Sequence, residues 1–390
     1  MYEIKLMNKI SPVIYDYLPR NRFHVSSHIA DDECDAMIVR SAPLHDIELS
    51  DRLLCIARAG AGTNNIPVPA CSQKGIVVFN TPGANANAVK ELVLCCLIGA
   101  ARNVFEAFDW VQDLKDDSPE DIAALIEKGK GQFVGHEIMN KTLGVIGLGE
   151  IGIRVANVAA AVGMNVIGFD PYLSVDHAWH ISRGTQRAVK LEELLTESDF
   201  ISIHIPQTKD TMNYLSTPEF SKMKPGVVIV NMARGGLVKD VSLFDAIDNG
   251  IVRKYITDFP SAQMIGRKGI VAIPHLGAST PESEENCAIM AAQEVRSYLE
   301  TGTIQNSVNL PPCAVEPITQ ERLTVIHKNT PNMVGQITRV IAASSMNIAD
   351  MVNKSRGEYA YTVLNLDHKL TPEVTDAIEA IPDVIKIRDL

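Results

Sequence analysis

Residues 141–171 read KTLGVIGLGEIGIRVANVAAAVGMNVIGFDP, and this stretch decides the fold of the chain. It begins with a short apolar run of the length expected for a buried parallel strand. Gly147, Gly149 and Gly152 follow in G-x-G-x-x-G spacing and lead into an alanine- and valine-rich helical segment. A second apolar run ends on Asp170. Strand, glycine turn, helix, strand and acid in this order predict a dinucleotide-binding unit.

Each position in the turn has its own physical role. Gly147 permits the tight turn after the strand, Gly149 lets the backbone approach a pyrophosphate, and Gly152 lets the helix pack close to the strand. The free N–H groups of Glu150 and Ile151 are expected to face the anion at the helix N-terminus. A glycine-rich turn that binds nothing is the alternative, and the complete strand-to-acid unit weighs against it.

Asp170 predicts which dinucleotide binds. Its carboxylate is expected to accept hydrogen bonds from the adenosine ribose hydroxyls. A 2′-phosphate would meet this negative charge, and no arginine follows within the next few residues. The predicted cofactor is therefore NAD rather than NADP.

The composition of the whole chain excludes several classes of protein. At 390 residues the chain suits two or three domains, and its net charge of −11 argues against a nucleic-acid partner. The apolar stretch Leu92–Ala101 is too short to span a membrane, and no signal peptide is visible. Seven cysteines without a C-x-x-C motif are expected to be buried thiols in a reducing cytoplasm. A cytoplasmic protein with no membrane partner is expected.

The N-terminal region alternates apolar runs with polar pieces. Residues 35–39, 53–58 and 75–80 are predicted strands of a small parallel α/β domain, whose ligand side lies at the carboxyl ends of the strands. Arg40 and Gly60 fall at such ends. From the residues alone, a solvated surface arginine is the favoured interpretation of Arg40.

The next segment joins this domain to the dinucleotide unit. Asn85 is predicted to cap a helix that continues to about Phe108. The acidic stretch 113–127 is predicted to be a surface arm or connection.

Further βα repeats follow the fingerprint and predict a doubly wound parallel sheet. Its later strands are expected at 199–206, 227–231, 255–258 and 270–275. Arg234, Asp258 and His275 fall at carboxyl ends of these strands, where ligands bind in such sheets.

A long helix is predicted from Pro281 to about Leu299, followed by a proline-rich linker over 306–317. The last seventy residues then predict a separate small unit. Strands at 322–327, 359–366 and 384–388, with helices near 335–345 and 372–380, favour the ferredoxin-like order β-α-β-β-α-β.

Four motifs together resemble the D-isomer-specific 2-hydroxyacid dehydrogenases over essentially the whole chain. They are VIGLGEIG with Asp170, HIPQT at 204–208, NMARGG at 231–236 and PHLGAST at 274–280. The C-terminal unit resembles the ACT effector-binding domain through VIHKNTPNMVGQIT at 325–338 and MNIADM at 346–351.

The resemblance implies an architecture of three domains and a linker. These are a flavodoxin-like substrate-binding lid (1–87 with 281–305), an NAD-binding Rossmann domain (88–280), a linker (306–319) and a ferredoxin-like ACT regulatory domain (320–390).

It also implies an activity, the NAD-dependent oxidation of 3-phospho-D-glycerate in the first step of L-serine biosynthesis. Arg234 would bind the substrate carboxylate and the oxygen being oxidised. A planar guanidinium suits that role because it makes two parallel hydrogen bonds to a carboxylate. His275 would take the hydroxyl proton while hydride leaves C2, and an imidazole can both accept and return a proton near neutral pH.

Other positions match less specific parts of the family pattern. Residues expected near the substrate are Arg40 and Ser41 at its phosphate, the backbone of Ala59 and Gly60 at its carboxylate, and Asn85 at the lid edge. Residues expected at the cofactor are Gly147, Gly149, Glu150, Ile151, Gly152, Asp170, His204, Pro206, Thr208, Ala233, Arg234, Asp258, His275 and Gly277. No metal is expected.

One departure from the family concerns the partner of His275. The family places a glutamate shortly after an Asp-Val-Phe run, and aligning on Phe-Pro puts Ala262 at that position. Asp258 is the tentative substitute, one of Glu282, Glu284 and Glu285 is an alternative, and His275 could also work without a carboxylate. Without one, the imidazolium would be less stabilised.

The C-terminal unit suggests regulation. His327, Asn329 and Asn347 match positions that bind L-serine in inhibited members of the family. Asn332 stands where the motif usually has glycine, and asparagine tolerates a positive φ better than most residues. Serine inhibition is therefore expected in a homodimer or homotetramer. The alternative is a unit that only joins subunits edge to edge.

Two other functions remain open. The same chemistry could act on another D-2-hydroxy acid such as glyoxylate, lactate or 2-hydroxyglutarate, although Arg40 and the C-terminal unit weigh against this. The chain could instead be an NAD-sensing binding protein of the corepressor type. The missing glutamate leaves room for that, and the absence of a partner-binding extension weighs against it.

Overall fold

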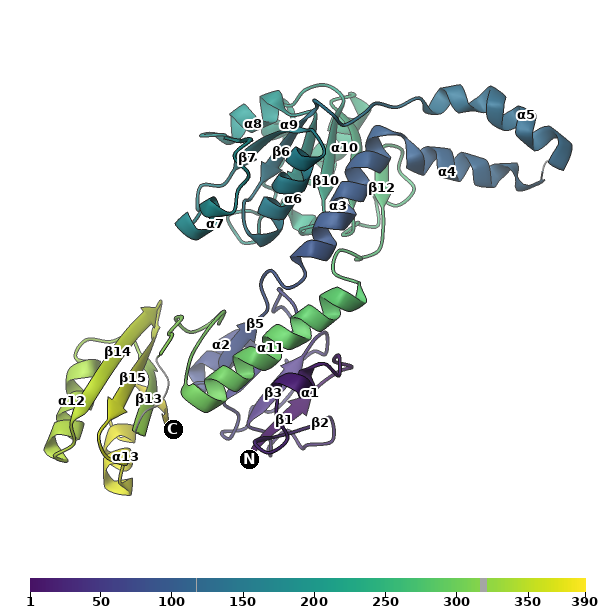
Figure 1. Ribbon diagram of the computed structural model, residues 1–390. Coiled ribbons are helices and arrows are strands. Elements are labelled where there is room, and N and C mark those ends of the chain that lie inside the picture. Colours follow the sequence, from purple (N-terminus) through teal and green to yellow (C-terminus); the bar gives the residue numbers. More distant parts are fainter. Residues whose placement is uncertain (117, 316–320) are drawn as a thin grey trace. The chain divides into compact units, whose positions relative to one another are not determined.

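A computed structural model describes residues 1–116, 118–315 and 321–390 (Figure 1). The chain divides into two compact units, Met1–Asn85 with Pro281–Leu390, and Ala86–Thr280. The region predicted as a separate C-terminal domain is thus grouped with the N-terminal region.

The first unit contains a five-stranded parallel sheet of order β2-β1-β3-β4-β5. This is the strand order of flavodoxin-like folds. Its strands are β1 (Tyr2–Leu6), β2 (Phe23–Ser26), β3 (Ala36–Val39), β4 (Cys55–Arg58) and β5 (Val77–Asn80). Its helices are α1 (Ile14–Tyr17), α2 (Val68–Gln73) and α11 (Pro281–Thr301).

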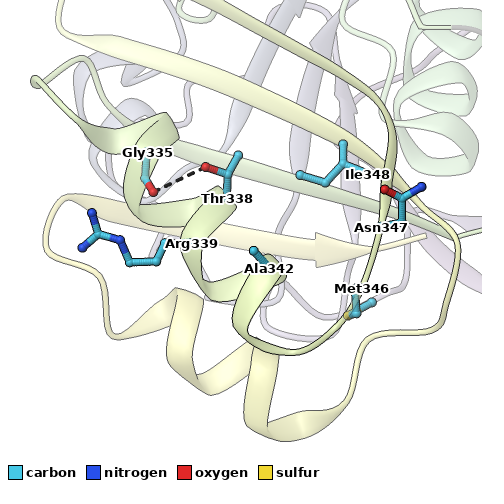
Figure 2. A pocket seen from close by; sticks show the side chains of 7 residues that line it. All are labelled: Gly335, Thr338, Arg339, Ala342, Met346, Asn347 and Ile348. Carbon is cyan, nitrogen blue, oxygen red and sulfur yellow. Dashed lines mark hydrogen bonds between the residues drawn. The ribbon is translucent and has the colours of Figure 1, made fainter.

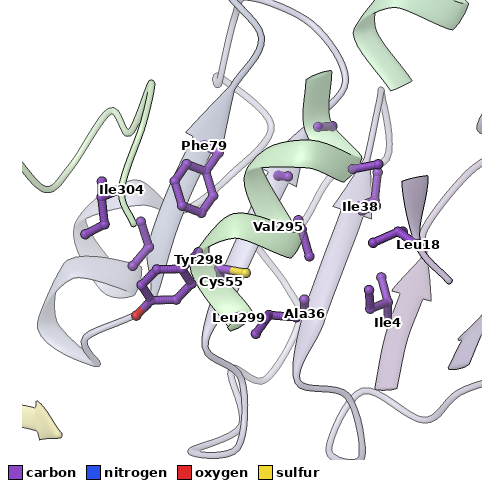
Figure 3. Close-up of a cluster of buried hydrophobic side chains, with 14 of the residues drawn as sticks. Ile4, Leu18, Ala36, Ile38, Cys55, Phe79, Val295, Tyr298, Leu299 and Ile304 are labelled. Atoms are coloured by element: carbon purple, nitrogen blue, oxygen red, sulfur yellow. The ribbon is translucent and has the colours of Figure 1, made fainter. Parts of the chain in front are cut away.

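Helix α11 supplies one side of the core of this unit. Val295, Tyr298 and Leu299 point from it into a cluster of buried side chains that includes Ile38 and Phe79 (Figure 3). All of these residues have almost no solvent exposure. A helix that follows the sheet by two hundred residues in sequence is therefore an integral part of the N-terminal fold.

The second unit contains a seven-stranded parallel sheet of order β12-β11-β10-β9-β6-β7-β8, the predicted doubly wound arrangement. Its strands are β6 (Thr142–Ile146), β7 (Asn165–Phe169), β8 (Thr185–Arg187), β9 (Phe200–Ile203), β10 (Val227–Asn231), β11 (Val252–Thr257) and β12 (Ile270–Ala272). The helices beside it are α3 (Ala86–Ala101), α6 (Glu150–Ala161), α7 (Val175–Trp179), α8 (Leu191–Glu197), α9 (Thr217–Phe220), α10 (Asp240–Asp248) and the short η3 (Gly235–Leu237). Two separate apolar clusters cover the two faces of the sheet, one with α3 and α6 and the other with α8, α9 and α10.

The helix predicted to run from Asn85 to Phe108 is broken in two. Helix α3 ends at Ala101, and Asn103 adopts a left-handed conformation (φ 53°) that an α-helix cannot continue through. A helical arm follows and projects from the rest of the unit (Figure 1). It consists of α4 (Val104–Asp113), η1 (Leu114–Asp116), α5 (Pro119–Gly129) and η2 (Lys130–Phe133). The acidic stretch predicted as a surface arm is thus largely helical.

The C-terminal subdomain, residues 321–390, has the predicted ferredoxin-like order. Its elements are β13 (Glu321–Lys328), α12 (Met333–Ala343), β14 (Ile348–Arg356), β15 (Tyr359–Leu366), α13 (Pro372–Glu379) and β16 (Val384–Asp389). The antiparallel sheet has the order β14-β15-β13-β16. Helices α12 and α13 cover one face. Ile326, Tyr361 and Val363 from the other face join the core around α11.

Three side chains of this subdomain donate to the carboxyl end of α11. Arg388 reaches the carbonyls of Tyr298 and Leu299, Arg322 that of Thr301, and Tyr361 that of Gly302, at 2.7–3.1 Å. The last carbonyls of a helix have no partner within the helix. We call Arg322, Tyr361 and Arg388 the C-terminal clamp, because they satisfy these carbonyls and tie the subdomain to the helix.

The predicted linker is packed rather than free where the structure describes it. The side-chain oxygen of Asn309 accepts from the Val78 N–H at 2.9 Å, and its amide donates to Ser72 and to the Ile76 carbonyl. Ser307, Asn309, Leu310 and Cys313 are buried. Linker residues 316–319 and the expected first ACT residue, 320, lie outside the described residues.

The cysteine prediction holds for six of the seven thiols. All seven are free, and all are buried except Cys95, which is exposed on α3. Among the helices of the described ranges, none combines the length and the apolar character needed to cross a bilayer.

Candidate active site

The glycine turn has the geometry that each glycine was expected to provide. Gly147 has φ 90°, and a Cβ there would lie 2.8 Å from the His204 carbonyl group. A Cβ on Gly152 would lie 1.9 Å from the Gly147 oxygen, so α6 could not approach β6 with any larger residue. A Cβ on Gly149 would meet nothing within 4 Å. This open backbone at the N-terminus of α6 fits a pyrophosphate.

Asp170 supports the turn from the end of β7. Its carboxylate oxygens accept from the N–H groups of Leu148 and Tyr172, each at 2.8 Å. The carboxylate of Glu150, at the start of α6, lies 3.7 Å from Arg154 and 3.4 Å from His177. Arg154 offsets part of this negative charge beside the predicted phosphate site.

The expected residues at 204–208 directly follow β9. Burial lowers the pKa of His204 to about 3, so its ring is neutral, and its Nε2 lies 2.8 Å from Ser202 Oγ. Thr211 Oγ1 donates to the Pro206 carbonyl at 2.6 Å and accepts from the Thr208 N–H at 2.7 Å. Thr211 thereby fixes the backbone on which Pro206 and Thr208 were predicted to meet the cofactor.

Asn231 shapes the loop that carries Arg234. This buried side chain donates to the Arg234 carbonyl at 2.8 Å and to the Tyr255 hydroxyl at 2.9 Å. Its oxygen accepts from the Ala233 N–H at 3.1 Å. The guanidinium of Arg234 donates to the Ala233 carbonyl at 2.6 Å. The sequence motif therefore holds its own loop in place, and the arginine projects from a fixed turn.

Asp258 lies beside both predicted catalytic residues. Its Oδ2 accepts from the Gly277 N–H at 3.1 Å, two residues after His275, while its buried Oδ1 has no hydrogen-bond partner. Burial raises the pKa of Asp258, opposed by the Gly277 N–H and by His275 and Arg234 nearby. The carboxyl group of Asp258 is thus tied to the histidine loop through the backbone and lies near both His275 and Arg234.

No carboxylate is hydrogen-bonded to the His275 ring among the described residues. Ala262 is exposed and carries no charge. Glu284, one of the alternatives, is paired with Arg40 at 2.6 Å. The ring of His275 instead packs on Phe259, with ring centroids 4.3 Å apart. Sequence inspection overlooked Phe259, although it lies within the run used to locate the missing glutamate.

In the first unit, Asn8 organises the strand end at Arg40. Its side-chain oxygen accepts from the N–H groups of Arg40, Ser41 and Ala42 at 2.8–3.3 Å. Ala59 follows β4, the neighbouring strand. The side-chain oxygen of Asn85 is buried and makes no hydrogen bond, so the predicted helix cap is not formed.

Arg58 is a second cation at this edge that the sequence reading overlooked. Its Nε donates to the Arg40 carbonyl at 3.1 Å. A Cβ on Gly60 would lie 2.6 Å from its guanidinium, so the glycine leaves room for it. Arg40 and Arg58 both lie near Cys287, since each opposes the rise in the pKa of the Cys287 thiol that burial causes. The position of Arg58 at the end of a predicted strand was the available signal.

The three predicted effector residues do not meet within one chain. His327, at the end of β13, bonds Thr362 and the Lys328 carbonyl, and Asn329 bonds the Glu358 and Gly357 carbonyls. Asn347 precedes β14, whose first residue pairs with Leu366 opposite Glu321, at the start of β13. Asn347 therefore lies at the opposite end of the sheet from His327 and Asn329.

Asn347 belongs instead to a surface pocket of about 440 Å³ between α12 and the start of β14 (Figure 2). Its lining also includes Gly335, Thr338, Arg339, Ala342, Met346 and Ile348. Asn332, just before α12, has φ 68°. The prediction that asparagine accepts a positive φ at this position is confirmed.

Comparison with known proteins agrees with this geometry. Residues 94–277 match the family described as D-isomer specific 2-hydroxyacid dehydrogenase, NAD binding domain. The chain is 32% identical to D-3-phosphoglycerate dehydrogenase of Archaeoglobus fulgidus, over 81% of this chain and 60% of that protein. It is 37% identical to the enzyme of that name from Mycobacterium leprae, over 71% and 52%. The match thus spans about half to three fifths of these relatives.

A solved structure described as NAD⁺-bound 3-phosphoglycerate dehydrogenase from Entamoeba histolytica is also similar. It is 27% identical with a TM-score of 0.63, over 79% of this chain and 98% of that one. A glyoxylate reductase from Paecilomyes thermophila is 25% identical with a TM-score of 0.63, over 79% and 98%. Over residues 94–277 the chain belongs to the NAD-binding domain family of the D-isomer specific 2-hydroxyacid dehydrogenases.

Proposed function

We propose that the protein oxidises 3-phospho-D-glycerate to 3-phosphohydroxypyruvate with NAD, the first step of L-serine biosynthesis. The observation that carries this proposal is the convergence of Arg234, Asp258 and His275 at one edge of the doubly wound sheet. The arginines at 40 and 58, at adjacent strand ends of the other unit, suit an anionic substrate. The relatives named D-3-phosphoglycerate dehydrogenase support this choice of acid.

Each residue has a distinct role in the proposed reaction. Bound NAD supplies the hydride acceptor. Arg234 pairs with the substrate carboxylate and orients C2, because its planar fork can form two parallel hydrogen bonds. His275 takes the hydroxyl proton as the C2 hydrogen departs with its electron pair. Asp258 lies near His275, and a carboxylate in this place favours the imidazolium that results.

The domains have different roles in the proposed reaction. Residues 88–280 hold NAD through the Gly149 turn and Asp170. Residues 1–87 with 281–305 form the substrate-binding lid, and there Arg40, Ser41 and Arg58 take the phosphate. The N–H groups of Ala59 and Gly60, which were expected at the carboxylate, already donate to the Val39 and Arg58 carbonyls at 2.8 Å each. Residues 320–390 form an ACT regulatory domain after the linker at 306–319.

A steady-state assay of NAD reduction tests the substrate. We expect 3-phosphoglycerate to be preferred over D-lactate, glycolate and D-2-hydroxyglutarate by at least about tenfold in kcat/KM, and Arg40→Gln to remove much of that preference. The similarity to a glyoxylate reductase makes another 2-hydroxy acid the second candidate. A preference for an unphosphorylated acid would establish it. Binding of NAD without turnover of any acid would favour the corepressor-type function.

We also infer that L-serine inhibits the enzyme at a site shared by two copies of the chain. His327 and Asn329 lie at one end of the sheet and Asn347 at the other, so one chain cannot contact a single amino acid with all three. Strand β14 is at the sheet edge. Antiparallel pairing of two β14 strands about Val352 would bring Asn347 of one copy opposite Gly357 of the other. Asn329 donates to the Gly357 carbonyl at 3.2 Å.

Mixed oligomers provide the test. Asn329→Ala and Asn347→Ala should each abolish serine inhibition alone. Oligomers that mix the two variants should recover part of it, because half of the sites at a mixed interface are intact. Effector coupling of this kind is typically worth about 1–3 kcal/mol, so the apparent affinity for the substrate should change about 5–150-fold. Full activity of the unaltered enzyme at saturating serine would exclude the site.

A further inference from the structure

The ring of Phe259 lies against both side chains to which the proposed chemistry is assigned. Its centroid is 4.3 Å from that of the His275 imidazole, with the planes tilted by 48°. The guanidinium carbon of Arg234 is 5.4 Å from the same centroid. An aromatic ring attracts a cation within about 6 Å of its centroid, because its face carries partial negative charge. Phe259 is therefore in range of Arg234 and, once it is protonated, of His275.

Backbone contacts fix where this ring lies. The Phe259 N–H donates to Thr257 Oγ1 at 3.0 Å. A Cβ on Gly235 would lie 3.1 Å from the Phe259 carbonyl oxygen and 3.5 Å from its Cβ. A side chain at position 235 would therefore push the two loops apart by a few tenths of an ångström. Because these loops extend from the adjacent strands β10 and β11, the sheet itself sets the position of the ring.

The charged groups near His275 indicate that the aromatic ring of Phe259 does more than fill space beside it. Arg234 and Asp258 are charged groups of this unit near the loop, and both His275 and Arg234 oppose the rise in the Asp258 pKa that burial causes. One oxygen of Asp258 is already bonded to the Gly277 N–H. Ala262 supplies no charge where a carboxylate partner was expected. Among the described residues, Phe259 is the side chain whose aromatic ring packs directly against the imidazole of His275.

We propose that Phe259 is a positioning residue of this site. Its ring keeps Arg234 and His275 apart at a fixed separation, and its π face stabilises the imidazolium that forms when the substrate hydroxyl gives up its proton. This role rests on the proposed oxidation. The proton moves from the hydroxyl oxygen to the imidazole, and the C2 hydrogen leaves with its electron pair as the hydride that bound NAD would accept. An aliphatic side chain would fill the same space without a π face.

The first test is a titration that does not depend on activity. The ring C–H signals of His275, assigned by comparison with His275→Gln, are followed by NMR against pH in the full-length chain. Phe259→Leu should lower the midpoint of the titration by about half to one pH unit, and Phe259→Tyr should leave it unchanged. Phe244→Leu is the matched control, since its ring lies 4.5 Å from the guanidinium carbon of Arg267, outside the site.

The second test is kinetic. For Phe259→Leu we expect kcat to fall about tenfold with a smaller change in KM, and the acidic limb of the pH profile to move down with the titration midpoint. An unchanged midpoint in a folded Phe259→Leu protein would overturn the proposal. If that variant does not fold, Phe259→Met takes its place. If the unaltered protein does not oxidise 3-phosphoglycerate, the substrate assignment fails while the titration still decides the role of Phe259.

Discussion

Arg388 contacts Tyr298 through a hydrogen bond and through a cation–π interaction. Its guanidinium donates to the Tyr298 carbonyl at 3.1 Å, and its central carbon lies 4.6 Å from the centre of the tyrosine ring. The arginine comes from the last strand of the chain and the tyrosine from the fully buried face of α11. A charged donor thus closes the junction between the C-terminal subdomain and the helix.

Arg388→Met is expected to destabilise the first unit by about 2–3 kcal/mol. The substitution keeps much of the side-chain volume but leaves the Tyr298 and Leu299 carbonyls without a charged donor. Urea unfolding followed by circular dichroism measures the loss. Arg296→Met on the same helix is the control, because Arg296 is more exposed and pairs with Glu300 at the surface. Equal losses of unfolding free energy in the two variants would show that Arg388 stabilises the unit no more than a surface arginine does.

Glu294 should make the protein less stable as the pH rises. Burial raises the pKa of this carboxyl from 4.5 to about 8, and Asn306 is the hydrogen-bond donor to it, at 2.7 Å. Between these pH values the folded state keeps a proton that the unfolded state has released. Stability therefore declines from about pH 4.5 to pH 8, by about 1.4 kcal/mol per unit at most.

Glu294→Gln should remove that decline, so the variant gains stability relative to the unaltered protein between pH 5 and pH 8. Thermal unfolding across this range measures it. Glu300→Gln on the same helix is the control with the opposite sign. Burial acts to raise the pKa of Glu300, but hydrogen bonds from Arg22 and Arg296 lower it overall. Its removal should cost stability above pH 4.5. Parallel pH curves for the unaltered protein and Glu294→Gln would refute the assignment.

Asp258→Asn should reduce kcat by about ten- to a hundredfold. The amide can still accept from the Gly277 N–H, but it no longer offers a negative charge to the protonated His275. The pH profile of kcat and the affinity for NAD should be measured together. Asp240→Asn, at the start of α10, is a control outside the site. If both quantities are unchanged in Asp258→Asn, this carboxylate is not the partner of the histidine.

Asp170→Ala should weaken NAD binding about ten- to a hundredfold and admit NADP. The carboxylate is expected to bond the ribose hydroxyls, and hydrogen bonds to a charged group are worth about 1.5–3 kcal/mol. The substitution also releases the Leu148 and Tyr172 N–H groups. Fluorescence titration with both dinucleotides measures the change, with Asp176→Ala on α7 as the control. Unaltered discrimination between NAD and NADP would show that another residue selects the cofactor.

Local patterns in the sequence were sufficient for the dinucleotide fold. The glycine spacing predicts contacts within thirty residues. Those contacts are present, since the Gly147 N–H donates to the Phe169 carbonyl and Gly152 lies against the Gly147 oxygen. The apolar runs predict buried strands, although β4 and β5 begin two residues later than expected. The βαββαβ order of the tail is likewise a local property, because each of its elements has its own periodicity.

Features that depend on distant contacts were not predictable in this way. Proline content indicated a linker but not where it packs. Asn309 is buried because it satisfies the edge strand β5, more than two hundred residues earlier. The break at Asn103 is a single left-handed residue inside an apolar pattern. Phe259 gains its role only when β10 and β11 pair side by side. The separation of Asn347 from His327 follows from strand register, which a motif match does not contain.

The clamp has a consequence for how such a chain could change in length. A protein that ended before residue 321 would expose the apolar surface that Ile326, Tyr361 and Val363 now cover. It would also remove the side-chain donors to the Thr301 and Gly302 oxygens and the charged donor to the Tyr298 and Leu299 oxygens. Such a truncation would therefore leave the N-terminal part of the first unit less stable and more prone to aggregate. A shorter variant of this chain would need polar residues on that side of α11 to remain folded.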